Sequence, residues 1–427
     1  MTKQKTFETQ KKIEEKAILI GVITPDTPKK YTEPLDELAS LTRTAGAEVL
    51  DCITQNRLKP DGASYLGHGK LEQVKTLAEK KGANLIISDD DLLPTQAKNI
   101  EKITGKRVID RTELILHIFA NNAKSSEAKL QVELAQLKYF LPKLKRLWQH
   151  LDRYEGGIGT RGPGEKQIES DKRIIRKKIA DLSASIEKIE ERKAREVTER
   201  CNKFLTVALI GYTNAGKSTL MNLITNADVL VEDKLFSTLD TRTRLWNIEG
   251  RKILLSDTVG FIEKLPHSLV ASFRATLEEA KQADLLLHIV DASHPDAAHQ
   301  IEVVHDVLEE IGFADKTVLL VFNKTDAVED SVDFSHLRIM YPEHISISAK
   351  KGTNRLELEQ KVLSLLESKM IDLSLTLPIH EGKWISWFEE YTRILEKRWD
   401  EQNVYYRVRL TQGNADWVMA ALTELKS

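Results

Sequence analysis

The segment GYTNAGKS at 211–218 has residue types at a spacing that can hold a chain of phosphates. A β-branched apolar run precedes it and a helical pattern follows, and the order strand, G-x-x-x-x-G-K-S, helix predicts a P-loop. Gly211 and Gly216 would let backbone N–H groups wrap around the phosphates. Lys217 would neutralise phosphate charge, and Ser218 would place its hydroxyl on Mg²⁺. The predicted phosphate contacts are Gly211, Tyr212, Thr213, Asn214, Ala215, Gly216, Lys217, Ser218 and Thr219.

Two later segments predict that the base is guanine. VLLVFNKTD at 318–326 places an N-K-T-D tetrapeptide at the end of an apolar strand. The Asp326 carboxylate can accept both the N1 and the N2 protons of guanine, a pair that adenine does not offer. SISAK at 346–350 ends the next strand, where the Ala349 N–H would meet guanine O6. Either segment alone is a weak signal, but together, in this order, they select GTP over ATP. The predicted base contacts are Asn323, Lys324, Thr325, Asp326, Ser348, Ala349 and Lys350.

The residues between these segments predict a Mg²⁺ site and the hydrolytic groups. In ILLSDTVGF, Asp257 suits a water-mediated hold on Mg²⁺, and the Gly260 N–H can bond the γ-phosphate. Upstream, Thr238 in LFSTLDTRTR would close over both, although other threonines, a serine and a tyrosine nearby compete for this role on spacing alone. We predict Lys217, Thr238 and Gly260 as catalytic, with Ser218, Thr238 and (through water) Asp257 on the metal. The surrounding contacts are Phe236, Ser237, Leu239, Asp240, Thr258 and Val259.

Two positions in these motifs bear on the rate of hydrolysis. Phe261 follows Gly260, where many GTPases carry a glutamine that orients the attacking water. A phenylalanine cannot orient water, so we expect slow intrinsic hydrolysis and a partner that supplies the missing positioning. Asn214 has two open interpretations: it holds K⁺ beside the phosphates, or it only caps the loop.

The rest of the chain predicts four folded parts in an α/β protein. The chain has 427 residues, 41% hydrophobic and 30% charged, and its two cysteines lie far apart, so we expect a cytoplasmic protein with reduced thiols. After a polar tail (1–16), alternating strands and helices predict a small parallel α/β domain (17–125). Periodic apolar residues predict an antiparallel helical hairpin (126–200). A Ras-like P-loop domain (201–369) follows, and then a small βαβ module (370–427) with an amphipathic helical pattern at 384–399.

The glycine-rich stretch GGIGTRGPGE at 156–165 lies between the two predicted hairpin helices. Gly157 to Gly162 match the G-x-G-x-x-G spacing of a dinucleotide site, but a helical pattern precedes them and no βαβ unit encloses them. From Lys138 to Lys178 there are twelve Lys and Arg residues against five Asp and Glu. The stretch therefore predicts a basic tip at 152–173 that faces a polyanion, with contacts from Arg153, Arg161, Lys166, Lys172 and Arg173.

These motifs resemble the HflX family, bacterial GTPases associated with translation. The resemblance rests on RVIDRTELILHIFANNAKSSEAKLQVELAQLKYFLPKL (107–144), GGIGTRGPGEKQIESDKR (156–173), GYTNAGKSTLMN, the segment 257–293 that begins DTVGFIEKLPHSLVASFRATLEEA, and NKTD. It implies a protein whose GTP form binds the 50S ribosomal subunit, with the hairpin tip on 23S rRNA near the peptidyl transferase centre. It also implies stimulation of hydrolysis by ribosomes, a role in ribosome splitting under stress or in biogenesis, and a Phe-x-Thr-Leu-Asp context that supports Thr238. We expect a monomer off the ribosome.

Two other functions fit the sequence less well. A GTP-switched adaptor of a protein partner, such as a membrane protease complex, would not need the basic tip. An ATP-driven RNA-remodelling enzyme is disfavoured by the guanine-reading segments. YLGHGKLEQVK at 65–75 occurs in HflX-like proteins, for which an ATP site has been suggested, but its spacing favours a tight turn before a helix. The C-terminal module varies within the family, so the resemblance assigns it no functional residue.

Overall fold

The computed structural model describes residues 15–25, 27, 33–148, 163–201, 203–225, 235–236, 242–264, 280–313, 315–328 and 332–424. The chain divides into two compact units, one made of residues 1–123 with 129–182 and the other of residues 124–128 with 183–427. Both contain parallel β-sheets with helices, which confirms the predicted α/β class. No helix in the described ranges has both the length and the apolar composition that crossing a bilayer requires.

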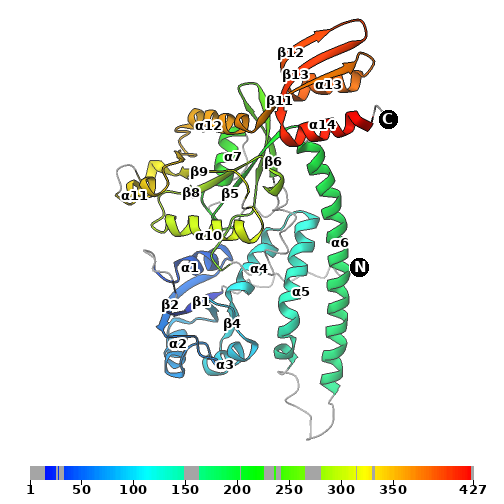
Figure 1. Cartoon of the computed structure of the whole chain (residues 1–427). Coiled ribbons are helices and arrows are strands. Elements are labelled where there is room, and N and C mark those ends of the chain that lie inside the picture. Colours follow the sequence, from blue (N-terminus) through cyan, green and yellow to red (C-terminus); the bar gives the residue numbers. More distant parts are fainter. Residues whose placement is uncertain are drawn as a thin grey trace, which may run out of the picture. The chain divides into compact units, whose positions relative to one another are not determined.

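A four-stranded parallel sheet forms the start of the first unit. Its strands are β1 (Lys16–Ile23), β2 (Glu48–Asn56), β3 (Leu85–Ser88) and β4 (Arg107–Asp110), in the spatial order β2-β1-β3-β4. The helices are α1 (Asp36–Thr44), α2 (His68–Lys81), α3 (Pro94–Thr104) and α4 (Arg111–Asn122). Helices α1 and α4 lie on one side of the sheet and α2 and α3 on the other (Figure 1). Because both faces are covered, β1 and β3 are buried almost throughout and read as continuous apolar runs.

Two long helices follow, α5 (Ser126–Trp148) and α6 (Pro163–Cys201). Glu133 pairs with Lys178, and Glu127 pairs with Lys193 at 2.6 Å, so residues earlier in α5 meet residues later in α6 and the two helices are antiparallel. Helix α6 begins at Pro163, so residues 163–173 of the predicted tip are helical and not part of a turn. Proline favours this position because the first turn of a helix needs no donor from it.

The buried carboxylate of Asp110 joins α5 to the parallel sheet. It lies at the end of β4, is 2% exposed, and caps α4 by accepting the Glu113 N–H at 3.0 Å. It also accepts the Leu92 N–H at 3.2 Å, the Lys143 ammonium at 2.6 Å and the Tyr139 hydroxyl. Burial, and then the Asp110 charge, raises the pKa of Tyr139, which keeps that hydroxyl protonated as a donor. One carboxylate therefore joins the second half of α5 to the end of β4.

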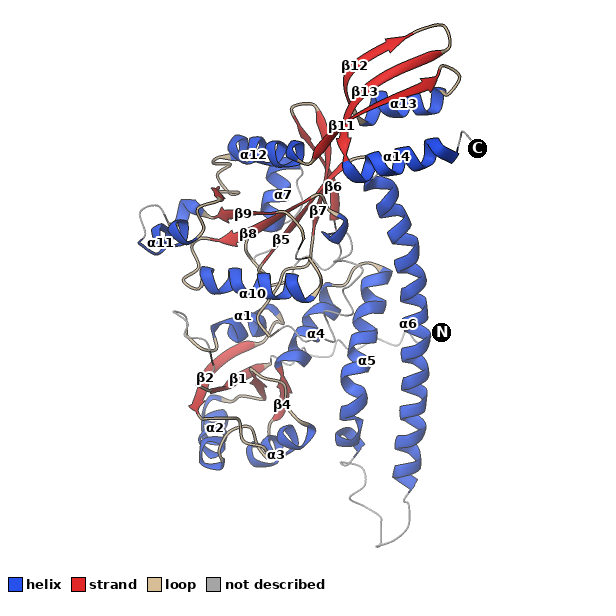
Figure 2. Cartoon of the chain, in the orientation of Figure 1, coloured by secondary structure: helices blue, strands red, loops and turns tan. Residues whose placement is uncertain are grey.

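A six-stranded sheet in the second unit carries the nucleotide motifs. Its strands are β5 (Leu205–Gly211), β6 (Arg242–Ile248), β7 (Arg251–Asp257), β8 (Leu285–Asp291), β9 (Val318–Asn323) and β10 (His344–Ser346). The order is β10-β9-β8-β5-β7-β6, parallel except for β6. One core packs the sheet against α7 (Lys217–Thr225) and α12 (Arg355–Ser368), and a second packs it against α10 (Ala297–Glu310) and α11 (Val332–Met340), as Figure 2 shows. Motifs at the carboxyl ends of β5, β7, β9 and β10 therefore meet at one edge.

The C-terminal segment differs from the predicted βαβ module. It consists of β11 (Met370–Pro378), α13 (Gly382–Tyr391), β12 (Arg393–Trp399), β13 (Asn403–Thr411) and α14 (Gln412–Glu424), with an antiparallel sheet in the order β11-β13-β12. The helix predicted from the amphipathic pattern at 384–399 is therefore wrong beyond Tyr391, because residues 393–399 form a strand. Pairing of β12 with β13 across a short turn overrides the local pattern.

Candidate nucleotide-binding site

Backbone geometry makes glycine necessary at both ends of the phosphate loop. Gly211 has φ +142°, and a Cβ there would lie 2.2 Å from the carbonyl oxygen of Ile289 on β8. Gly216 has φ +93°, and a Cβ there would lie 2.3 Å from Nδ2 of Asn323. The loop thus passes directly against β8 and the end of β9, which brings the phosphate motif next to the base motif.

Lys217 lies inside this loop. Its Nζ donates to the carbonyl oxygens of Gly211 at 2.9 Å and Tyr212 at 2.8 Å, and the residue is buried. Burial lowers the pKa of Lys217 to about 8, while the nearby Asp257 charge opposes this effect. A triphosphate in the loop would favour the protonated form of Lys217 and raise its pKa. The lysine is therefore positioned to bind a polyanion.

Ser218 and Asp257 supply the oxygen groups that fit Mg²⁺. The Ser218 hydroxyl donates to Oδ2 of Asp257 at 2.7 Å, and Asp257 is fully buried. The neighbouring Thr258 hydroxyl donates to the Leu209 carbonyl oxygen at 2.7 Å, which fixes the end of β7. A hydroxyl and a carboxylate beside phosphate oxygens are the ligands that Mg²⁺ takes in such sites. The described residues hold no separate group of three or more His, Cys, Asp or Glu side chains suited to a metal.

The segment after Asp257 is hydrogen-bonded to the phosphate loop. Thr213 N donates to Phe261 O at 2.8 Å, Phe261 N donates to Gly211 O at 3.1 Å, and Glu263 N donates to the Tyr212 hydroxyl at 2.7 Å. Phe261 is 3% exposed, so its ring is part of the core and presents nothing to a water molecule. The burial of Phe261 agrees with the expectation that this residue cannot orient the attacking water. The contact made by Tyr212 has no sequence signal, because it joins residues 51 apart.

Asn323 ties three segments of the base site together. Its Nδ2 donates to Ala215 O in the phosphate loop at 2.9 Å, and its Oδ1 accepts the Ala349 N–H at 2.9 Å. Lys324 has φ +61°, and its Nζ pairs with Asp291 at 2.6 Å. Sequence reasoning missed Asp291, although its position at the end of β8 matches that of Asp257 at the end of β7.

Asp326 is held as an acceptor. Its Oδ1 accepts the hydroxyl of Ser348 at 2.6 Å, and this hydrogen bond holds the pKa of Asp326 below its ordinary value. Thr325 braces the same turn, because its hydroxyl donates to Ile347 O at 2.9 Å. Both predicted base segments therefore meet, with an ionised carboxylate at neutral pH that can accept two guanine donors.

For several predicted residues the structure describes only burial or the element that carries them, and others lie outside the described part of the chain. Phe236 is buried, whereas Lys350 is exposed. Lys172 and Arg173 lie on α6, where Arg173 is exposed. Lys166 is also on α6, but its side chain lies outside the described residues. The predicted residues beyond the described ranges are Ser237, Thr238, Leu239, Asp240, Arg153 and Arg161.

The parallel sheet with its glycine-bounded phosphate loop, buried lysine and N-K-T-D turn defines a P-loop GTPase. Three family models match: "GTP-binding GTPase N-terminal" at residues 32–120, "GTP-binding GTPase Middle Region" at 122–200 and "50S ribosome-binding GTPase" at 206–324. The protein named GTPase HflX from Caldanaerobacter subterraneus subsp. tengcongensis is 43% identical over 399 residues, covering 93% of this chain and 91% of that protein. The one from Escherichia coli is 40% identical over 408 residues, covering 94% and 95%. The chain therefore belongs to the HflX family of GTPases and is a GTP hydrolase.

Among solved structures, the chain is similar to a GTP-binding protein from the hyperthermophilic archaeon Sulfolobus solfataricus in complex with GDP. The sequence identity is 27%, the TM-score is 0.43, and the match covers 82% of this chain and 98% of that chain.

Proposed function

We propose that the GTP-bound protein binds the 50S ribosomal subunit through the α5–α6 hairpin and that hydrolysis permits release. The hairpin tip contacts 23S rRNA near the peptidyl transferase centre, and the protein acts in the cytoplasm to split stalled ribosomes under stress or in ribosome biogenesis. The observation that carries this proposal is the basic start of α6. Lys172, Arg173, Arg176, Lys177 and Lys178 fall within seven residues that contain no acidic side chain. All except Lys172 are exposed, and only Lys178 forms an ion pair within the described residues.

The phosphate site supports a switch that depends on the nucleotide. Ser218 and Asp257 would hold Mg²⁺, with Thr238 joining them when the γ-phosphate is present. Lys217 and the Gly260 N–H would stabilise charge on the γ-phosphate during its transfer to water. Because Phe261 is buried, the ribosome supplies the positioning that accelerates hydrolysis. Asn214, with φ +62° in the loop, would place its side chain to hold K⁺ beside the phosphates. Equal rates in K⁺ and Na⁺ buffers would refute the last point.

Sedimentation with purified ribosomal subunits tests the proposal. With a non-hydrolysable GTP analogue the protein should travel with the 50S subunit, and with GDP it should remain unbound. Absence from the 50S fraction with the analogue would overturn the ribosomal function.

A charge-matched pair of variants tests the tip. The tip variant replaces Arg153, Arg161 and Lys166 with Ala, and the control replaces Lys188, Arg192 and Arg195, on the distant part of α6, with Ala. Loss of three phosphate contacts should reduce the slope of log affinity against log salt by about 2–3 and weaken 50S binding and stimulated hydrolysis. The control should retain both. Equal behaviour of the two variants would exclude the tip as the rRNA contact.

A further inference from the structure

The outer face of the C-terminal sheet is open and carries charged side chains in rows. Helices α13 and α14 cover the other face, where Phe388 of α13 and Val418 of α14 pack with Val408 of β13. On the outer face, strand register places Asp372, Arg409 and Arg393 in one row, then Ser374, Arg407 and Glu396, then Thr376, Tyr405 and Arg398. Neighbours in such a row lie about 5 Å apart at Cβ, so these side chains form one continuous surface.

Shared carboxylates hold the arginines of this face in place. Asp372 pairs with Arg409 at 2.7 Å and with Arg407 at 3.1 Å. Glu396 pairs with Arg407 at 3.7 Å and Arg398 at 3.6 Å. Each carboxylate therefore braces two guanidinium groups without cancelling both charges. A braced guanidinium loses less conformational freedom when it binds phosphate, which makes the array preorganised for an anion.

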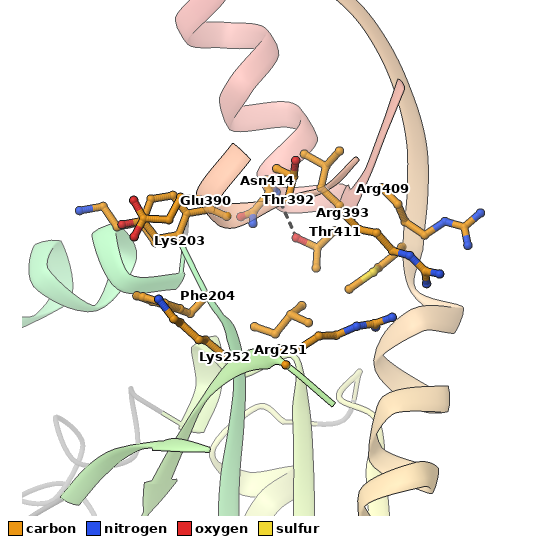
Figure 3. Close-up of a pocket in the computed structure, with 15 residues that line it drawn as sticks. Lys203, Phe204, Arg251, Lys252, Glu390, Thr392, Arg393, Arg409, Thr411 and Asn414 are labelled. Atoms are coloured by element: carbon orange, nitrogen blue, oxygen red, sulfur yellow. Dashed lines mark hydrogen bonds between the residues drawn. The ribbon is translucent and has the colours of Figure 1, made fainter. Parts of the chain in front are cut away.

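The basic surface continues onto the six-stranded sheet. Glu367 on α12 pairs with Arg393 at 3.0 Å and with Arg251 at the start of β7. In Figure 3 the guanidinium groups of Arg251, Arg393 and Arg409 extend to the same side of a cavity of about 410 Å³. Lys203 and Lys252 also line this cavity, together with Glu390. Five arginines thus share three carboxylates, and the two lysines beside Glu390 add one net positive charge.

An exposed aromatic ring lies at the other end of the face. Tyr405 is 43% exposed and lies opposite Arg398 in the strand register. It lines a second hollow of about 560 Å³, together with Arg398 and Arg407. A ring open to solvent beside arginines offers a stacking surface for an unpaired base.

We propose that this face, defined by Arg393, Arg398, Tyr405, Arg407 and Arg409, binds unpaired RNA. The arginines contact phosphates, and the Tyr405 ring stacks on a base. Duplex RNA would hide its bases from this ring, and a protein partner would require a larger apolar centre than this polar face provides. RNA rather than DNA rests on the proposed ribosomal function, whereas the binding of an unpaired strand rests on this face alone.

Fluorescence anisotropy with a labelled, unstructured RNA of about fifteen nucleotides tests the proposal on the full chain. The tip variant serves as the background, so that binding by the hairpin does not mask the sheet. Tyr405→Ala should weaken binding at least fivefold, as expected for loss of one stacked base. Arg398→Ala with Arg407→Ala should also reduce the salt slope by about 1.4. The matched control replaces Lys80 and Lys102, exposed on α2 and α3, with Ala and should bind as the background does.

Photocrosslinking of the same RNA carrying 4-thiouridine should label a peptide that contains Tyr405. RNA affinity that the sheet variants leave unchanged would overturn the proposal, as would displacement of the RNA by poly-glutamate at lower concentration than by unlabelled RNA. Weaker binding to RNA than to DNA of the same sequence would refute the choice of RNA but not the face. Because 50S sedimentation is measured separately, failure of this proposal leaves the tip contact standing.

Discussion

Asp110→Ala should destabilise the first unit more than any exposed substitution in it. The change removes the cap of α4, which is worth about 0.5–2 kcal/mol. It also leaves the ammonium of Lys143, whose side chain is 14% exposed, without its carboxylate. Breaking a buried pair by removing one partner costs about 3–5 kcal/mol, because the remaining charge stays desolvated. The two losses share one side chain and do not add, so we expect a loss of about 3–5 kcal/mol.

Amide hydrogen exchange measured by mass spectrometry can localise this loss. Peptides from α4 and from α5 should exchange roughly 100-fold faster or more, as a change of this size implies. Peptides from β5 and α7 in the second unit should exchange at the original rate, and GDP affinity should be unchanged. Asp110→Asn combined with Lys143→Met removes both charges and keeps a capping side chain, so it should recover most of the loss. A loss below about 1 kcal/mol, or no recovery in the double variant, would refute the anchoring contact.

Three further predictions concern the nucleotide unit. Tyr212→Phe removes the acceptor of the Glu263 N–H, so this amide should exchange about fivefold faster, while the control Tyr341→Phe leaves it unchanged. Asp326→Asn should weaken GTP binding by about 100-fold or more and favour xanthine nucleotides, which competition binding can measure; retained guanine preference would contradict the base assignment. Burial, with help from the positive charges of His305 and Lys217, lowers the pKa of His288 from 6.5 to about 3. Below pH 6.5 only the unfolded chain binds this proton, so stability should fall with decreasing pH towards 3, and His288→Gln should flatten a urea-midpoint profile in that window.

The sequence alone determined those features whose functional residues are neighbours in the chain. The P-loop lies within one strand–turn–helix stretch, so the requirement for Gly211 and Gly216 and the place of Lys217 follow from local backbone rules. The parallel sheets also followed from the alternation of apolar strands and helical patterns. The start of α5 at Ser126 needed only its periodic apolar residues.

The tertiary structure decided whatever joins residues far apart in the chain. Residues 393–399 form a strand because β13 offers them a paired edge, which no local pattern reveals. Strand register likewise sets Asp372 between Arg407 and Arg409. The contacts of Tyr212 with Glu263 and of Asp110 with Lys143 depend on segments far apart in the chain that meet at the carboxyl ends of strands. The sequence contains these side chains, but the free energy that pairs them arises only when folding excludes water and brings them within hydrogen-bond distance.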